Sequence, residues 1–242
     1  MNYSVIIPIH NSHKRGIDRL KWQLLSLKNQ TTPPAMVFIP DSSDLSEFLQ
    51  NVASIKSWQS PPVHHFGCQH KDGGFNMPHL FNRGLERVET NYVLCTGIDF
   101  IYDPNLFTRY MDIANEKTLI LKEVEMLANM AITADMVNSF KFRKSPLNGA
   151  GRGADGIQFG HINLFKDLGG YDERMAGWGG MDNDLHDRSN KAGYKEVWCR
   201  GGRILHQWHR TEKGKGADLE QSKRNWRLRD LKNKEIRLKF IK

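Results

Sequence analysis

Short apolar runs alternate with amphipathic segments through about the first 100 residues, and this alternation constrains the fold more than any other feature of the chain. The apolar runs lie at 3–11, 35–44, 61–68 and 91–100, and the amphipathic segments lie at 15–30, 45–55 and 77–88. Continuous apolar runs are typical of parallel strands that are buried on both faces. The alternation of strand and helix therefore predicts an α/β fold in which helices flank a mostly parallel central sheet.

The pattern becomes less regular after about residue 115. Residues 118–140 fit either strands or a helix, and the glycine-rich stretch at 145–156 predicts a loop. We expect one domain followed by a basic extension that forms a helix or a tail. The expected boundaries are 1–210 for the domain, with halves 1–115 and 116–210, and 211–242 for the extension.

Composition and charge narrow the function classes. No apolar run reaches the roughly 18 residues that a spanning helix needs, and the first residues lack the basic start of a signal peptide. The protein is therefore expected to be cytoplasmic, in the cytoplasm of a host cell if a phage encodes it. Three cysteines without CxxC spacing predict neither a disulfide framework nor a zinc site. The formal net charge of +8, concentrated at 213–242, favours an anionic partner.

Polar side chains end several of the predicted strands. His10 and Asn11 follow the first strand, Asp41 follows the second, and Asp99 follows the fourth. Ligands of open α/β sheets bind beyond the carboxyl ends of the strands, so these residues predict a nucleotide cleft. Neither GxGxxG nor GxxxxGK[ST] occurs where it would be needed, which speaks against a dinucleotide-binding enzyme and a P-loop.

Segments in a fixed order along the chain resemble the GT-A nucleotide-sugar glycosyltransferases of the large inverting family 2. SVIIPIHN is similar to the first strand of that family, VFIPDSSD to its second strand with the base-binding aspartate, and FNRGLERVETNYVLCTGIDFIYDP to the block that leads into its DxD element. GGYDERMAGWGGMDNDLHDR is similar to the GWGG-acidic segment of β-1,4-galactosyltransferases and bacterial chondroitin-type polymerases. The resemblance covers roughly residues 3–210. It implies a Rossmann-like GT-A domain whose first half binds the nucleotide sugar and whose second half binds the acceptor.

The resemblance implies a donor site at the strand ends. Asp41 is expected to bind the pyrimidine or ribose, with a role as a strand-end turn residue as the alternative. Arg83 is expected to reach the phosphates unless it is a surface residue. Lys71 and Asp72, which precede two glycines, are further candidates. The full donor set is Pro8, Ile9, His10, Asp41, Arg83, Ile98 and Asp99.

The resemblance also implies a divalent metal, manganese in preference to magnesium. Its ligands would be Asp99 and His206, with His209 as a second candidate for the histidine. A metal can neutralise the diphosphate of a UDP-sugar and stabilise the leaving group, and a set of imidazole and carboxylate suits manganese better than magnesium. The element reads GID, with Gly97 where the family has its first aspartate, so only one of the two carboxylates of the motif supports the metal prediction.

The GWGG-acidic segment implies the acceptor site and the base. Asp182 aligns with the residue that removes the proton of the acceptor hydroxyl in an inverting transfer. Gly179 and Gly180 let the backbone approach the sugars, Trp178 offers a face for stacking, and Asp184 holds an acceptor hydroxyl or caps the helix. Favourable carboxylates at a helix N-terminus are the purely structural explanation, but that explanation does not account for Trp178.

Three functions remain open. Two are inverting transfer of a hexose from a UDP-sugar, either to a glycan or to a hydroxymethylated pyrimidine in phage DNA. Met181 and Asn183 replace acidic residues of the resembling enzymes, which predicts an altered acceptor, and the basic extension fits a DNA backbone. The third is a catalytically inactive GT-A domain that binds a nucleotide or a polyanion. Gly97 supports this third function, whereas the presence of Asp99 and Asp182 speaks against it.

Overall fold

The central feature of the fold is a seven-stranded sheet. The computed structural model describes residues 2–10, 13–69, 75–142, 157–177, 179–209 and 223–230, without the side chains of 13–15. The strand order is β3 (Val63–Gly67), β2 (Met36–Asp41), β1 (Tyr3–Ile6), β4 (Tyr92–Thr96), β8 (Ile157–His161), β6 (Thr118–Leu121) and β9 (Lys195–Trp198). Only β8 runs antiparallel to its neighbours. The predicted α/β fold with a mostly parallel sheet is confirmed.

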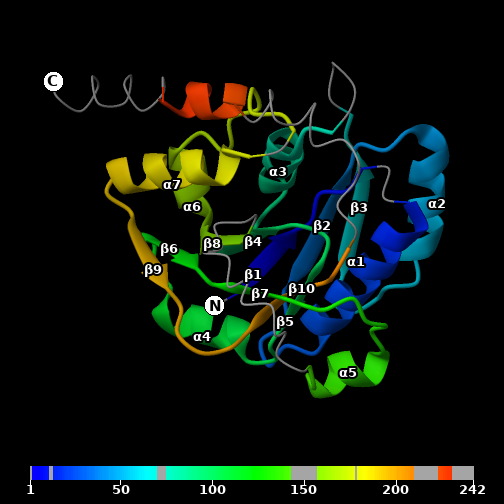
Figure 1. Cartoon of the computed structure of the whole chain (residues 1–242). Coiled ribbons are helices and arrows are strands. Elements are labelled where there is room, and N and C mark those ends of the chain that lie inside the picture. Colours follow the sequence, from blue (N-terminus) through cyan, green and yellow to red (C-terminus); the bar gives the residue numbers. More distant parts are fainter. Residues whose placement is uncertain are drawn as a thin grey trace, which may run out of the picture.

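Helices cover both faces of this sheet (Figure 1). One face carries α1 (His13–Lys28) and α4 (Leu106–Ile113), with α2 (Leu45–Ile55) beside α1 at the β3 edge. The other face carries α3 (Met77–Leu85), α6 (Ile162–Asp167) and α7 (Met181–Lys191). Neighbouring side chains of a strand point to opposite faces, so Val5 packs in the first core and Ile6 in the second. This double burial explains why the strands read as continuous apolar runs.

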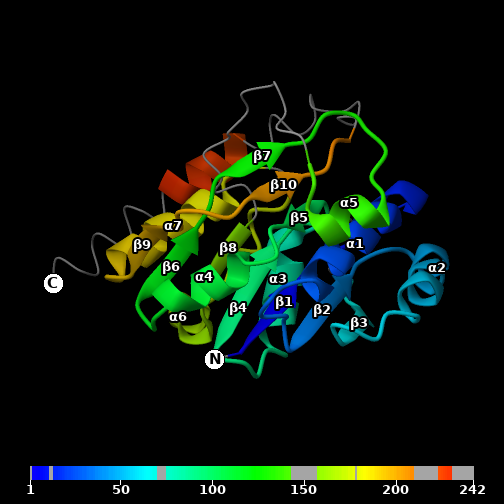
Figure 2. The ribbon, with the colours of Figure 1, turned by 90° about the horizontal axis from the view of Figure 1, so that it is seen from below.

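A second, smaller sheet lies beside the first. It consists of β5 (Phe100–Tyr102), β10 (Ile204–His206) and β7 (Val124–Met126), in that order, and Figure 2 shows β7 and β10 side by side. The antiparallel pairing of β10 with β5 sets His206 opposite Phe100. A segment near the end of the described chain is thereby brought to the GID corner.

Two expectations for individual segments need revision. The expectation of one strand over 91–100 is wrong in its second half, because β4 ends at Thr96 and Phe100 already belongs to the small sheet. The chain turns at Gly97, whose carbonyl accepts a hydrogen bond from the side chain of Gln23 instead of a ladder bond. Residues 118–140, left open between strand and helix, contain β6, β7 and the short helix α5 (Ala134–Ser139). The predicted loop at 145–156 lies outside the described residues.

Part of the basic extension is helical. Residues 223–230 form a helix on the α7 side of the molecule (red in Figure 1), and Leu228 packs against the core of that face. The rest of 211–242 lies outside the described residues. In the part of the chain that the structure describes, no helix is both long and apolar enough to cross a membrane.

Candidate active site

The corner between β4 and β5 carries Asp99. Gln23 of α1 donates a hydrogen bond to the Gly97 carbonyl at 2.8 Å, and the Gln207 amide donates to the Asp99 carbonyl, also at 2.8 Å. Ile98 packs, half-buried, against the core on the α1 face. The backbone of the corner is therefore held by α1 on one side and by the segment after β10 on the other.

Two histidines meet the Asp99 side chain. Its Oδ2 lies 3.4 Å from Nε2 of His206 and 3.1 Å from Nε2 of His209. One ligand atom from each of the three residues lies within 4.8 Å of the others, and all three side chains are half-buried. One carboxylate oxygen and two imidazole nitrogens form a donor set that first-row divalent metals accept. The structure thus brings Asp99 and His206 together as the sequence predicts, and adds the second candidate His209.

The electrostatics favour the forms that ligate metals. Burial alone would raise the pKa of Asp99, but the hydrogen bond from His209 and the charges of His206, His209 and Arg19 lower it below its ordinary value. Burial lowers the pKa of His206, helped by His209 and Arg19 against the opposing effect of Asp99. A metal needs an ionised carboxylate and a neutral imidazole, and both are favoured near neutral pH.

The loops after β1, β2 and β3 meet at the same edge of the sheet. The Ser42 amide donates to the Ile9 carbonyl at 3.1 Å, and the Cys68 amide donates to the Asp41 carbonyl at 2.7 Å. Pro8 is buried, whereas His10 is half-buried, with Nδ1 3.0 Å from the Ser42 hydroxyl. Pro8, Ile9, His10 and Asp41, which the sequence assigns to the donor, therefore lie together.

Asp41 itself is fully buried and held by protein donors. Oδ1 accepts from the Ser43 amide at 2.8 Å, while Oδ2 accepts from the Asn51 side chain at 2.9 Å and lies 2.9 Å from Nε2 of His65. Burial opposes ionisation, but the bonds from His65, Ser43 and Asn51 lower the pKa of Asp41. The N-cap of α2 is Asp44, whose side chain accepts a hydrogen bond from the Glu47 amide at 3.0 Å. A nucleotide reaches the Asp41 carboxylate only by displacing one of these donors.

Arg83 lies on α3, which covers the face of the sheet opposite α1. Its guanidinium pairs with Glu86 at 2.6 Å, and both side chains are exposed. Nearby, Sγ of Cys68 lies 3.5 Å from Nε2 of His79, whose Nδ1 lies 2.8 Å from a carboxylate oxygen of Glu173. No sequence motif reveals this chain of polar contacts, because its members come from three separate segments. Lys71 and Asp72 lie outside the described residues.

The proposed base lies at the start of α7. The Gln158 side chain donates to the Asp182 carbonyl at 3.4 Å, and Gln158 pairs across the sheet with Cys95 near the carboxyl end of β4. Asp182 is half-buried. The N-terminus of α7 and the Asp99 corner therefore flank the same end of β4, from the α7 face and the α1 face of the sheet respectively.

The other residues assigned to the acceptor occupy different environments. Gly179 and Gly180 have φ angles of 89° and 86°, which residues other than glycine rarely adopt. Gly180 is the N-cap residue of α7 and makes no side-chain hydrogen bond there. Asp184 is 1% exposed and accepts from Nε of Arg188 at 2.8 Å. Its carboxylate is thus paired with Arg188 inside the protein. Trp178 lies outside the described residues.

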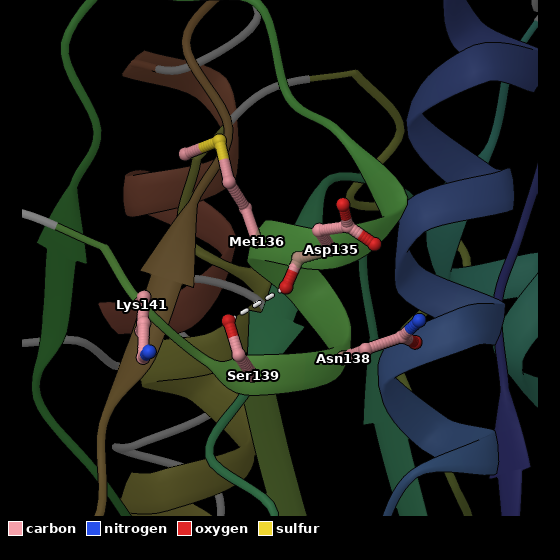
Figure 3. Close-up of a pocket in the computed structure, with 5 residues that line it drawn as sticks. All are labelled: Asp135, Met136, Asn138, Ser139 and Lys141. Atoms are coloured by element: carbon pink, nitrogen blue, oxygen red, sulfur yellow. Dashed lines mark hydrogen bonds between the residues drawn. The ribbon is translucent and has the colours of Figure 1, made fainter.

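A surface hollow of about 600 Å³ lies at α5. Asp135, Met136, Asn138, Ser139 and Lys141 line it (Figure 3). Its internal hydrogen bond joins the Ser139 hydroxyl to the Asp135 carbonyl at 2.6 Å, within the same helix. No group that the sequence analysis assigns to chemistry lines this hollow, so the edge of the central sheet is the better candidate site.

Comparisons with known proteins agree on the fold. No family model and no curated protein matches the sequence. S. aureus TarS 1-349 in complex with UDP-GlcNAc is similar with a TM-score of 0.61 and 17% identity over 88% of this chain and 60% of that chain. GalNAc-T7 with UDP, GalNAc and Mn2+ is similar with a TM-score of 0.63 and 14% identity over 86% of this chain and 44% of that chain. The mannosyltransferase PcManGT from Pyrobaculum calidifontis, in complex with GDP-Man and Mn2+, is similar with a TM-score of 0.58 and 16% identity over 95% of this chain and 60% of that chain.

These similarities identify the fold as GT-A. This chain spans 60% or less of the length of each of these three structures.

Proposed function

We propose that this protein is a glycosyltransferase that moves a hexose from a UDP-sugar to an acceptor hydroxyl with inversion. The observation that carries the proposal is the position of two groups at the same end of β4: the Asp99–His206–His209 cluster and the first turn of α7 with Asp182. The similar GT-A structures hold UDP-GlcNAc, UDP with Mn2+, or GDP-Man with Mn2+. This common ligand chemistry supports a nucleotide-sugar donor.

The donor half of the proposal rests on the Asp99 corner and the loops after the first three strands. Asp99, His206 and His209 would hold a divalent metal, manganese in preference to magnesium, which supplies positive charge for the diphosphate. Ile98 belongs to the same corner, and Pro8, Ile9 and His10 lie on the neighbouring loops. Asp41 would orient the nucleobase or ribose through the loop that it stabilises. We retain Arg83 as a candidate for the phosphates.

The acceptor half rests on the start of α7. Asp182 would accept the proton of the attacking hydroxyl while the leaving group departs from the opposite side of the sugar. A positioned base of this kind contributes about 10² to 10⁴ in rate. Gly179 and Gly180 would let the acceptor approach the backbone, and Trp178 would stack on a sugar or base. Asp184 would support this turn from inside through Arg188.

An anionic acceptor is favoured by the helix at 223–230. Lys223, Arg224 and Arg227 are exposed on it, and the helix contacts the segment before Asp182. Clustered basic groups beside an acceptor site attract a polyanion, with a binding strength that falls steeply as salt rises. The acceptor is a glycan or a hydroxymethylated pyrimidine in DNA, and this basic helix is the specific observation for DNA.

Transfer assays test the proposal directly. The protein is incubated with Mn²⁺, labelled UDP-hexoses and either hydroxymethylated DNA or oligosaccharides, with Asp182→Asn as the matched inactive control. Label in DNA alone or in glycan alone identifies the acceptor class. Binding of UDP without transfer to any acceptor and without donor hydrolysis would instead favour the inactive nucleotide-binding domain.

A further inference from the structure

Asn225 connects the basic helix to the segment that precedes Asp182. Its side-chain amide donates to the Ala176 carbonyl at 3.1 Å and to the Gly179 carbonyl at 2.9 Å. The side chain is 0% exposed, although it belongs to a helix whose neighbouring basic residues face the solvent. One amide group therefore bridges the two ends of the short stretch 176–179.

The segment that leads into α7 contains three glycines in an unusual backbone conformation. Gly177, Gly179 and Gly180 all have positive φ angles, between 76° and 89°. Glycine has the largest conformational freedom in an unconstrained chain, so ordering three glycines is costly. A buried amide that satisfies two carbonyls is a means of ordering them. A Cβ built on Gly180 would also lie 3.2 Å from Cβ of Asn225, which shows how closely the helix approaches the N-cap of α7.

The helix at 223–230 is itself anchored on α7. Nε of Arg229 donates to a carboxylate oxygen of Asp187 at 2.5 Å, and Leu228 packs against the core of the α7 face. These contacts keep Asn225 over the glycines, because they join the helix to the same element that carries Asp182. From the side of the sheet, Gln158 holds the Asp182 carbonyl.

We infer that Asn225 is a positioning residue for the proposed base Asp182, acting through the Gly179–Gly180 backbone. The inference rests on the proposed function, since it requires Asp182 to take the acceptor proton. Asn225 does not touch the acceptor. It fixes where α7 begins, and a displacement of a catalytic group by about 1 Å can cost on the order of 10²-fold in rate.

The test compares Asn225→Ala and Asn225→Asp with Asn190→Ala. Asn190 is the matched control, because it is an exposed asparagine on α7 whose amide donates to Glu196 instead of the glycine loop. Both Asn225 variants should lower kcat about 10²-fold while the affinity for UDP with Mn²⁺ stays within about twofold. Asn190→Ala should keep the kcat of the wild-type protein. Equal kcat in Asn225→Ala and wild type would overturn the inference.

A double mutant separates positioning from general destabilisation. In an Asp182→Asn background, adding Asn225→Ala should change the residual rate by less than about twofold, because residues that act as one unit are not additive. A full additional loss would mean that Asn225 acts independently of Asp182, which contradicts the inference.

Hydrogen exchange distinguishes a failure of the positioning inference for Asn225 from a failure of the proposed function. Backbone amides at 179–184 should exchange faster in Asn225→Ala than in the wild type, while the amides of β1 and β4 remain unchanged. If exchange is faster in Asn225→Ala but the wild-type protein transfers no sugar, the proposed function is refuted. The role of Asp182 as the base that Asn225 positions is then refuted as well. Unchanged exchange in an active enzyme refutes the positioning role alone.

Discussion

Oδ2 of Asp99 lies 3.1 Å from Nε2 of His209, although Asp99 follows β4 and His209 follows β10. The antiparallel pairing of β10 with β5 brings the two residues together. With His206 they form a cluster of one carboxylate and two imidazoles at the edge of the central sheet. The first prediction concerns the metal affinity of this cluster.

Manganese should stabilise the folded protein. At a free concentration 100 times Kd, a ligand that binds only the folded state adds about 2.7 kcal/mol. Asp99→Asn and His209→Ala should abolish the increase in melting temperature that calorimetry measures with Mn²⁺. The affinity should fall in acid, because protonated imidazoles do not ligate metals, and burial places the protonation of His206 below its ordinary pKa. His64→Ala, on β3, is the control, and an unchanged response in the Asp99 variant would argue against this site.

Asp182→Asn should abolish most transfer while UDP still binds. Loss of a general base costs about 10² to 10⁴ in kcat, and the amide keeps the size of the carboxylate. Titration calorimetry with UDP and Mn²⁺ measures binding, and the labelled-hexose assay measures transfer. A variant with near-normal kcat would show that another group takes the proton.

Asp184→Asn should destabilise the protein strongly. Asp184 and Arg188 form an ion pair with side chains only 2% and 6% exposed, so the substitution leaves a buried guanidinium without its counter-charge. Breaking such a pair costs about 3–5 kcal/mol, which urea unfolding measures. Glu86→Ala breaks the exposed pair with Arg83 and should cost about 1 kcal/mol or less. If Asp184→Asn retained full stability and only raised KM for the acceptor, the carboxylate would act on substrate instead.

Asp41 should contribute stability that is lost in acid. Its pKa is lowered on folding, so the folded state binds fewer protons than the unfolded state around the ordinary value of about 3.9. The contribution is fully present above that value and disappears as the pH falls through the lowered one. Unfolding free energies measured from pH 6 down to about pH 2 should therefore fall less steeply for Asp41→Asn than for the wild type. Parallel curves would contradict the shift.

Gly84→Ala should destabilise the protein by forcing α3 and β1 apart. A Cβ at Gly84 would lie 2.4 Å from Cγ2 of Ile6, well inside van der Waals contact. Overpacking of this kind costs about 1–3 kcal/mol, measured by urea unfolding. In an Ile6→Ala background, Gly84→Ala should cost less than in the wild type, because the clashing atoms are absent. Gly67→Ala is the control, because its Cβ meets Phe48 at an ordinary 3.6 Å; an equal loss there would point to a general effect.

The sequence by itself determined the features that depend on a few neighbouring residues. The helix predicted at 45–55 is α2, and Asp44 caps it, because capping and apolar periodicity are local properties. The buried runs that became β1, β2 and β4 were recognised because a strand covered on both faces must be apolar throughout. The position of polar residues at the strand ends followed from the same argument.

Beyond the Asp99–His206 pair that the family resemblance implies, only the folded structure reveals which of these polar residues meet, because side-chain partners depend on strand order and register. Both His206 and His209 contact Asp99, as a result of the pairing of β10 with β5. Asp184 is assigned to the acceptor from its place beside Asp182. Helical residues two positions apart do not share a face, so Asp184 faces inward and meets Arg188 four positions later. The contacts of Asn225 with the glycine stretch likewise join segments distant in sequence. Local sequence carries no information on such contacts, since their energy arises only when the chain closes on itself.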